Sequence, residues 1–272
     1  MRMTKGILIG MLSRLGRLCC GKRTPPTGGA SVEKASAGGS TKTDSIMVNS
    51  LGMKLAWIPL GTFQMGSNVS DDEKPIHTVK ITNGFYMGIY EVTQEQYKAV
   101  MGIDPSRFSG DNLPVDSVSW NDAVEFCKKL SQKEGKNYTL PTEAQWEYAC
   151  RAGTTMKYYF GDKESQLGEY AWYHQNSGGN THPVGKKKAN VWGLYDMLGN
   201  VLEWCQDRYV KDWYSKGPVE NPLNESYGDM KFCVLRGGGW GTYASHCRFS
   251  TRGYSYPDTR DYKNGFRVVL GL

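Results

Sequence analysis

Cysteine and histidine are the residues of this sequence best suited to metal binding, redox chemistry or nucleophilic catalysis. Beyond an N-terminal pair, the thiols are Cys127, Cys150, Cys205, Cys233 and Cys247. No two of these five form a C-x-x-C pair, so their spacing does not indicate structural zinc. Because their number is odd, at least one thiol must stay free or pair between chains. The other four could include one disulfide, and the sequence does not give its connectivity.

The positions of these residues favour structural roles. Cys127 and Cys150 fall within predicted helices, where a cysteine usually serves as a small buried hydrophobe. The four histidines, at positions 77, 174, 182 and 246, show no metal-ligand spacing. We expect them at the surface or in packing contacts.

Capping residues and apolar runs predict the elements that position these groups. Helices are predicted to begin after Thr93, Ser119 and Thr142, whose hydroxyls would accept a backbone N–H of the first turn. Short strands are predicted over Met53–Ile58, Phe63–Met65, His77–Ile81, Phe85–Ile89, Val234–Arg236 and Phe266–Val269. Residues 154–199 show almost no periodicity, which predicts a mixed α+β domain with long loops.

Composition bounds the class of protein. The 272 residues are 39% hydrophobic and 22% charged, with a formal net charge of +6, which excludes disorder of the whole chain. The sequence contains no run of about 18 apolar residues, so it predicts no membrane-spanning helix. The 17 Tyr and 8 Trp outnumber the 8 Phe, and such rings suit positions where one end meets water or a ligand.

The positive charge does not indicate a nucleic-acid partner. Eight of the 33 basic residues and two of the 27 acidic ones lie in the first 45 positions, which leaves 25 of each for the rest. No recognition helix, zinc-finger spacing or RNA-binding signature is present. The run Lys186–Lys188 is interpreted as a solvated loop.

The first 45 residues differ from the remainder. Residues 1–20 have a basic start, a short apolar run and a terminal pair of cysteines, a pattern typical of a secretory signal with a lipoprotein cleavage site. Residues 21–45 are rich in Gly, Ser, Thr, Lys and Pro and are predicted to be a flexible linker. We therefore expect lipidation at Cys19 or Cys20, with residues 46–272 displayed at a bacterial cell surface, on the outer membrane. A basic, disordered tail is the alternative.

Eight motifs between Met47 and Val269 keep the order and spacing of a known family. They are Phe63–Gly66, Glu91–Thr93, Val118–Trp120, Leu140–Ala149, Gly193–Met197, Gly199–Trp204, Arg236–Gly238 with Trp240, and Gly265–Val268. This pattern resembles the formylglycine-generating enzyme, or sulfatase-modifying factor, family. The resemblance implies an α+β, C-type-lectin-like fold that is rich in loops, with a small antiparallel sheet and two main helices.

Family resemblance does not settle activity. Enzymes of the family bind copper(I) between two cysteines five positions apart, and that spacing falls here on Thr242 and Cys247. A soft metal needs thiolates, and a hydroxyl does not replace one, so we expect no enzymatic activity and no cofactor. A copper oxidase of this fold, or a related iron oxygenase, is the alternative function.

The resemblance also implies a possible structural Ca²⁺ near Gly199–Glu203, with Glu203 as its carboxylate ligand.

The segment 236–269 divides into a frame and an interleaved set. The frame holds Gly, Arg and core residues, among them Arg236, Cys247, Arg248, Arg252, Arg260 and Gly265–Val269. The interleaved set, hereafter the variable set, contains residues that an NNY codon can encode. It comprises Gly241, Thr242, Tyr243, Ser245, His246, Phe249, Thr251, Gly253, Tyr254, Ser255, Tyr256, Thr259, Asp261, Tyr262 and Asn264.

This division resembles the variable region of proteins diversified by retroelements, in which adenine-directed mutagenesis of AAY codons gives NNY codons. Such codons exclude Trp, Met, Lys, Gln and Glu; all fifteen members obey this rule, whereas Lys263 does not. Tyr with small polar residues is the composition of an adaptable binding surface. We therefore predict a monomeric, non-catalytic protein whose variable set contacts a variable ligand, in most cases a protein. A structural accessory domain is a third possibility.

Overall fold

The computed structural model describes residues 45–228 and 230–271. The predicted signal segment, Cys19, Cys20 and residues 21–44 of the linker lie outside the described residues. Among those that are described, no helix is both long enough and apolar enough to cross a membrane.

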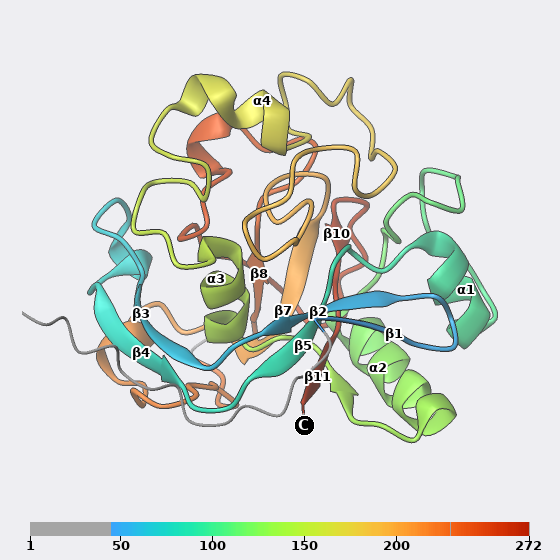
Figure 1. Ribbon diagram of the computed structural model, residues 1–272, viewed down its shortest axis with the longest axis horizontal. Helices are drawn as coiled ribbons and strands as arrows, with labels where there is room; N and C mark the ends of the chain where they lie inside the picture. The colour runs from blue at the N-terminus through green and yellow to red at the C-terminus, as the bar shows by residue number, and fades with distance from the viewer. Residues whose placement is uncertain (1–44, 229, 272) are drawn as a thin grey trace, which may run out of the picture. The chain divides into compact units, whose positions relative to one another are not determined.

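Eleven strands within the described ranges form three sheets (Figure 1). The strands are β1 (Ile46–Val48), β2 (Lys54–Ile58), β3 (Gly61–Met65), β4 (His77–Ile81), β5 (Phe85–Gly88), β6 (Tyr138–Thr139), β7 (Leu202–Arg208), β8 (Cys233–Arg236), β9 (Gly253–Ser255), β10 (Asn264–Gly265) and β11 (Val269–Gly271). The five-stranded sheet has the order β1-β2-β5-β11-β6, the four-stranded sheet has the order β10-β7-β8-β9, and β3 pairs with β4.

The sheets correct two expectations. Several small sheets replace the single one, and β10 pairs with β7 in parallel. Of the predicted strand Phe266–Val269, only Val269 lies in a strand, β11, because residues 266–268 cross from the sheet of β10 to the sheet of β11. The carbonyls of Phe266 and Val268 accept hydrogen bonds from the N–H groups of Val92 and Gly88, which holds this crossing.

Four α-helices lie in the described part of the chain: α1 (Gln94–Met101), α2 (Trp120–Glu134), α3 (Glu143–Arg151) and the short α4 (Leu167–Tyr170). The predicted starts are confirmed, because Thr93, Ser119 and Thr142 each form a complete capping box. Glycines in the left-handed conformation end α1 and α2, at Gly102 and Gly135. In Figure 1, α1 and α2 lie together on one side, while α3 lies beside β3.

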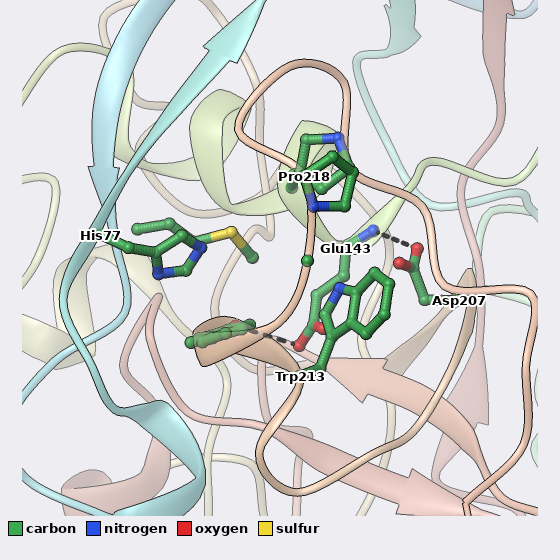
Figure 2. Close-up of a pocket in the computed structure, with 10 residues that line it drawn as sticks. His77, Glu143, Asp207, Trp213 and Pro218 are labelled. Atoms are coloured by element: carbon green, nitrogen blue, oxygen red, sulfur yellow. Dashed lines mark hydrogen bonds between the residues drawn. The ribbon is translucent and has the colours of Figure 1, made fainter.

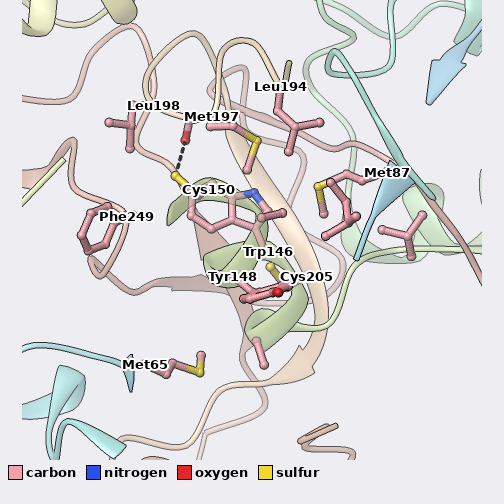
Figure 3. Close-up of a cluster of buried hydrophobic side chains, with 14 of the residues drawn as sticks. Met65, Met87, Trp146, Tyr148, Cys150, Leu194, Met197, Leu198, Cys205 and Phe249 are labelled. Atoms are coloured by element: carbon pink, nitrogen blue, oxygen red, sulfur yellow. Dashed lines mark hydrogen bonds between the residues drawn. The ribbon is translucent and has the colours of Figure 1, made fainter. Parts of the chain in front are cut away.

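Two hydrophobic cores hold these elements. One surrounds Trp146 of α3, which is fully buried with Cys150, Met197 and Leu198 (Figure 3). The other lies beneath α1 and α2 and includes Tyr97, Phe126, Trp204 and Phe266. Trp120 and Trp240, which the family motifs also contain, remain partly exposed, so only half of these four tryptophans serve as fully buried core residues.

Candidate ligand-binding site

The frame of the C-terminal segment is fixed by ion pairs. Each of its arginines binds at least one carboxylate from outside the segment. The pairs are Arg236 with Glu143 and Glu147, Arg248 with Glu73, Arg252 with Glu143, Arg260 with Asp122, and Arg267 with Glu203. All are buried except Arg260, which is 59% exposed at its side chain. These ion pairs hold the segment 236–269 against the rest of the domain, and no member of the variable set takes part in them.

The variable set lies largely at the surface. Tyr243, Ser245, His246, Tyr254 and Tyr256 are exposed, and eight further members are partly exposed. The eight are Gly241, Thr242, Thr251, Gly253, Ser255, Thr259, Asp261 and Tyr262. Many of the residues that separate them, such as Ala244, Cys247, Arg248 and Arg252, are buried, whereas Asp258 and Arg260 are exposed. The predicted division into frame and variable set therefore coincides with a division in burial at most positions, but not at all of them.

Three members of the set depart from this pattern. Phe249 is 3% exposed and its ring lies 3.8 Å from the guanidinium carbon of Arg151, so our expectation of a surface anchor there is wrong. Asn264 is 3% exposed because it pairs in β10 beside β7. A Cβ at Gly253 would lie 3.2 Å from the carbonyl oxygen of Leu235, which restricts that position to small residues.

One group of exposed rings surrounds Trp240, and we call it the Trp240 face. Tyr262 stacks on Trp240 with ring centroids 5.7 Å apart, and the guanidinium carbon of Arg107 lies 4.6 Å from the Tyr262 ring centroid. Beside it, Tyr243 contacts the ring of His174 at 4.4 Å. The N–H of His174 donates to the carbonyl of Thr242, which connects this loop to the variable set.

A second group surrounds Tyr254 and Tyr256, and we call it the Tyr254 face. The ring of Tyr254 lies 4.2 Å from that of Tyr209 and 4.8 Å from that of Phe232, which also contacts Tyr256 at 4.7 Å. A cavity of about 590 Å³ opens beside Tyr209, Phe232 and Tyr254.

The four-stranded sheet separates these two groups. Tyr254 belongs to β9 at one edge, while Tyr262 lies two residues before the start of β10 at the other edge. Three strand spacings of about 4.8 Å place the edges roughly 14 Å apart. The structure thus divides the predicted site into two faces, and it adds Arg107, His174, Tyr209 and Phe232. Sequence reasoning missed these four because they lie outside residues 236–269 and carry no motif.

The residues at the expected copper position do not suit copper(I). A Cβ at Gly238 would lie 3.0 Å from Cys247 Sγ and 3.2 Å from Thr242 Cγ2. The side chains of Thr242 and Cys247 therefore both lie close to Gly238. Cys247 is the single sulfur of this pair. It is fully buried, and burial raises the pKa of its thiol to about 12, which opposes the thiolate that a soft metal requires.

Glu203 is also unsuited to the calcium that the resemblance implies. Its Oε1 accepts from Arg267 Nη2 at 2.6 Å, and its Oε2 accepts from Arg267 Nε at 2.7 Å and from Trp146 Nε1 at 2.8 Å. Both oxygens are therefore engaged by a cation or a donor. Nothing in this arrangement leaves a carboxylate oxygen free for a hard cation.

The five cysteines of the described domain are buried and unpaired. Cys150 Sγ donates to the carbonyl of Met197 within the core around Trp146 (Figure 3). Cys127 and Cys150 lie buried in the two hydrophobic cores, as predicted for small hydrophobes, and burial raises the pKa of both thiols. In the run Lys186–Lys188, which was predicted to be solvated, Lys186 and Lys188 are exposed and Lys187 is partly exposed. The ammonium of Lys187 lies 3.8 Å from the centroid of the Trp172 ring.

Two buried carboxylates meet at the start of α3 (Figure 2). Asp207 accepts hydrogen bonds from the N–H groups of Glu143 and Asn224, and Glu143 accepts from the hydroxyl of Tyr214. Burial, and then the nearby charge of Glu143, raises the pKa of Asp207 to about 7. The adjoining cavity is only about 10 Å³, room for one water, so this cluster supports α3 rather than a ligand.

Comparison with known proteins places these features in context. Residues 46–272 match the family described as the sulfatase-modifying factor enzyme 1-like domain. The chain is 33% identical over 235 residues to the chaperone protein LppX of Paenibacillus barcinonensis, covering 68% of this chain and 79% of that protein. It is 34% identical over 173 residues to the formylglycine-generating enzyme of Streptomyces coelicolor, covering 58% of this chain and 52% of the enzyme.

A solved structure matches most of the described domain. Treponema denticola variable protein 1 superposes with a TM-score of 0.72 and 31% identity, covering 83% of this chain and 98% of that protein. The observed architecture is accordingly the α+β, C-type-lectin-like fold of the formylglycine-generating enzyme type, with several small sheets and four helices in the described ranges.

Proposed function

The chain belongs to the family of sulfatase-modifying factor enzyme 1-like domains, and we propose that it is a non-catalytic, surface-displayed binding protein whose C-terminal segment is diversified by a retroelement. One observation carries the proposal. Buried arginine pairs fix the frame, while thirteen of the fifteen members of the variable set are exposed or partly exposed. Side chains can change at such positions without loss of the core.

Further features support binding rather than catalysis. Variable protein 1 of Treponema denticola shares the fold, and the match covers 98% of its length. The resemblance places Thr242 where the enzymes of the family carry the first copper cysteine, and the Cys247 thiol is buried. The two faces present Tyr and Trp rings, which are frequent among the residues that dominate protein interfaces.

The origin of the variable set can be tested in the genome. We expect a nearby non-coding repeat of the segment that encodes residues 236–269, differing from the gene only at adenines, beside a reverse transcriptase. A repeat that differs at other bases, or a locus without a reverse transcriptase, contradicts diversification by this route.

Binding can be tested with two matched pairs of substitutions. Tyr243→Ala with Tyr262→Ala removes the rings of the Trp240 face, and Tyr254→Ala with Tyr256→Ala removes those of the Tyr254 face. Each pair is measured by surface plasmon resonance against a protein partner identified by crosslinking on cells. We expect at least one pair to weaken binding tenfold or more, and unchanged binding by all four substitutions together overturns the proposal.

The catalytic alternative has its own test. Purified protein loaded with copper(I) is incubated with a cysteine-containing peptide under oxygen, and formation of the aldehyde is followed by mass spectrometry. We expect no turnover, and turnover that is lost in Cys247→Ala refutes the non-catalytic assignment.

The N-terminal pattern supports display at the cell surface. We propose that residues 1–20 direct export and that Cys19 or Cys20 carries lipid, with residues 21–45 as the tether. Mass spectrometry of the mature N-terminus identifies the modified cysteine, and an unmodified N-terminus beginning at Met1 contradicts the proposal.

A further inference from the structure

The Trp240 face carries two cations that lack a carboxylate partner. Arg107 is exposed and Lys263 partly exposed, and neither forms an ion pair within 4.0 Å with any residue in the described ranges. Both contact the same ring, since Arg107 Cζ lies 4.6 Å and Lys263 Nζ lies 5.7 Å from the centroid of Tyr262. Lys263 Nζ also lies 5.9 Å from the Trp240 centroid.

Three carboxylates close to these cations in the sequence accept hydrogen bonds from the backbone. Asp116 is fully buried and accepts the backbone N–H groups of Arg107 and Phe108, and Asp104 accepts that of Ser106. Asp261 accepts the backbone N–H of Lys263. These carboxylates stabilise turns of the backbone, so the two side-chain cations keep their charge available to a partner.

Neither cation belongs to the variable set. Lys263 interrupts the set because an NNY codon does not encode lysine, and Arg107 precedes α2 far outside the segment. Trp240 is a frame residue, and the edge of its ring contacts Phe108 at 5.8 Å. The Trp240 face therefore combines a constant cationic, aromatic part with the variable members Tyr262, Tyr243 and Gly241.

Resting on the proposed function, we infer that the Trp240 face recognises an acidic protein segment through Arg107 and Lys263. Contact with a ring face orders both cations before binding, which reduces the entropy lost when each meets a carboxylate. Arg with Trp and Tyr is also the combination most frequent among residues that dominate protein interfaces. The constant cations give attraction to acidic surfaces in general, and the variable residues select among them.

Poly-L-glutamate is the probe that tests this inference. The full chain is immobilised and its affinity is measured by biolayer interferometry at 25 and 300 mM NaCl. We expect binding that weakens with salt and falls at least tenfold in Arg107→Gln with Lys263→Gln. The matched control is Lys98→Gln with Lys129→Gln, two exposed lysines of α1 and α2 without an ion pair among the described residues, and we expect less than a twofold change.

The outcomes separate the inference from the function on which it rests. An equal loss in the control pair, or no binding of poly-L-glutamate, overturns the inference. Binding of heparin or of phosphatidylglycerol vesicles in place of poly-L-glutamate also overturns it, because the partner would then be a polysaccharide or a membrane. The protein partner identified by crosslinking is measured as well. If Tyr243→Ala with Tyr262→Ala abolishes binding of that partner while Arg107→Gln with Lys263→Gln retains it, the Trp240 face is the binding face but its partner is not recognised through acidic groups. If neither pair of substitutions changes binding of that partner, the Trp240 face is not the binding face.

Discussion

Asp196 shows how a single buried group can work against stability. It is 1% exposed, its Oδ2 accepts from the N–H of Gly185 at 2.7 Å, and its Oδ1 has no hydrogen-bond partner. Burial raises the pKa of Asp196 from 3.8 to about 6. The backbone φ of Asp196 is 54°, in the left-handed region, and asparagine tolerates that conformation as well as aspartate does.

We expect Asp196→Asn to stabilise the protein above pH 6. Between pH 3.8 and 6 the folded state binds the proton of Asp196 more tightly than the unfolded state does, so the free energy of unfolding falls as the pH rises through this window. The two-unit difference corresponds to about 3 kcal/mol. Urea unfolding at pH 4, 6 and 8 should show a gain for the variant that grows with pH.

The control for Asp196→Asn is Asp111→Asn at an exposed aspartate, which should track the native protein at each pH. A gain that is equal at pH 4 and pH 8 contradicts the assignment of this pH dependence to Asp196. The comparison uses differences between variants because Asp207, whose pKa is about 7, contributes its own dependence to every protein in the series.

At the scale of elements, the C-terminal segment owes its conformation to charge pairs rather than to regular structure. Between β8 and β11 the chain contains only the short strands β9 and β10 and a single 3₁₀ turn, Ala244–His246. Arg252 binds both oxygens of Glu143 in α3, at 2.7 and 2.9 Å, and donates to the carbonyl of Asp72. Such contacts replace the hydrogen-bond ladders that a longer strand would provide.

We expect Arg252→Met to lower the free energy of unfolding by about 3–5 kcal/mol, because it leaves part of the buried charge of Glu143 uncompensated. The matched substitution is Arg260→Met in the same segment, which breaks an exposed pair with Asp122 and should cost about 1 kcal/mol or less. Urea midpoints measure both. Equal losses in the two variants would show that burial does not distinguish these pairs.

Local chemistry made some elements predictable and tertiary contact hid others. Thr93, Ser119 and Thr142 predicted their helices because a capping box is complete within four residues. The crossing of residues 266–268 from one sheet to the other depends on partners more than 170 residues away, such as the carbonyl of Gly88 that accepts from Arg267. No local pattern encodes such a partner. The resemblance implied one small sheet, whereas the described residues form three.

At the scale of the whole molecule, the sequence predicted the exposure of most members of the variable set but not their arrangement in space. Codon chemistry selected Tyr243, Tyr254 and Tyr262 correctly as residues with access to solvent. It also selected Phe249, since a codon rule takes no account of the core. The separation into a Trp240 face and a Tyr254 face follows from strand order in the four-stranded sheet, which sequence spacing does not reveal.

The arrangement predicts that the fold tolerates wide change at the variable set. In a yeast-displayed library, NNY codons replace twelve of its members, with Gly253, Phe249 and Asn264 held constant because of their burial or tight packing. We expect most clones to resist protease as well as the native protein does, since surface substitutions usually change stability by about 0.5 kcal/mol or less.

The comparison library carries NNY codons at buried frame positions, namely Arg236, Cys247, Arg248 and Arg252, and most of its clones should be cleaved. These four changes leave buried carboxylates unpaired or open the core, at several kcal/mol each against a typical stability of about 5–15 kcal/mol. Similar survival in both libraries would mean that the arginine pairs do not hold the segment. Survival confined to the first library would show that twelve positions of the variable set can vary while one fold persists, which is the physical requirement for a binding surface that diversifies.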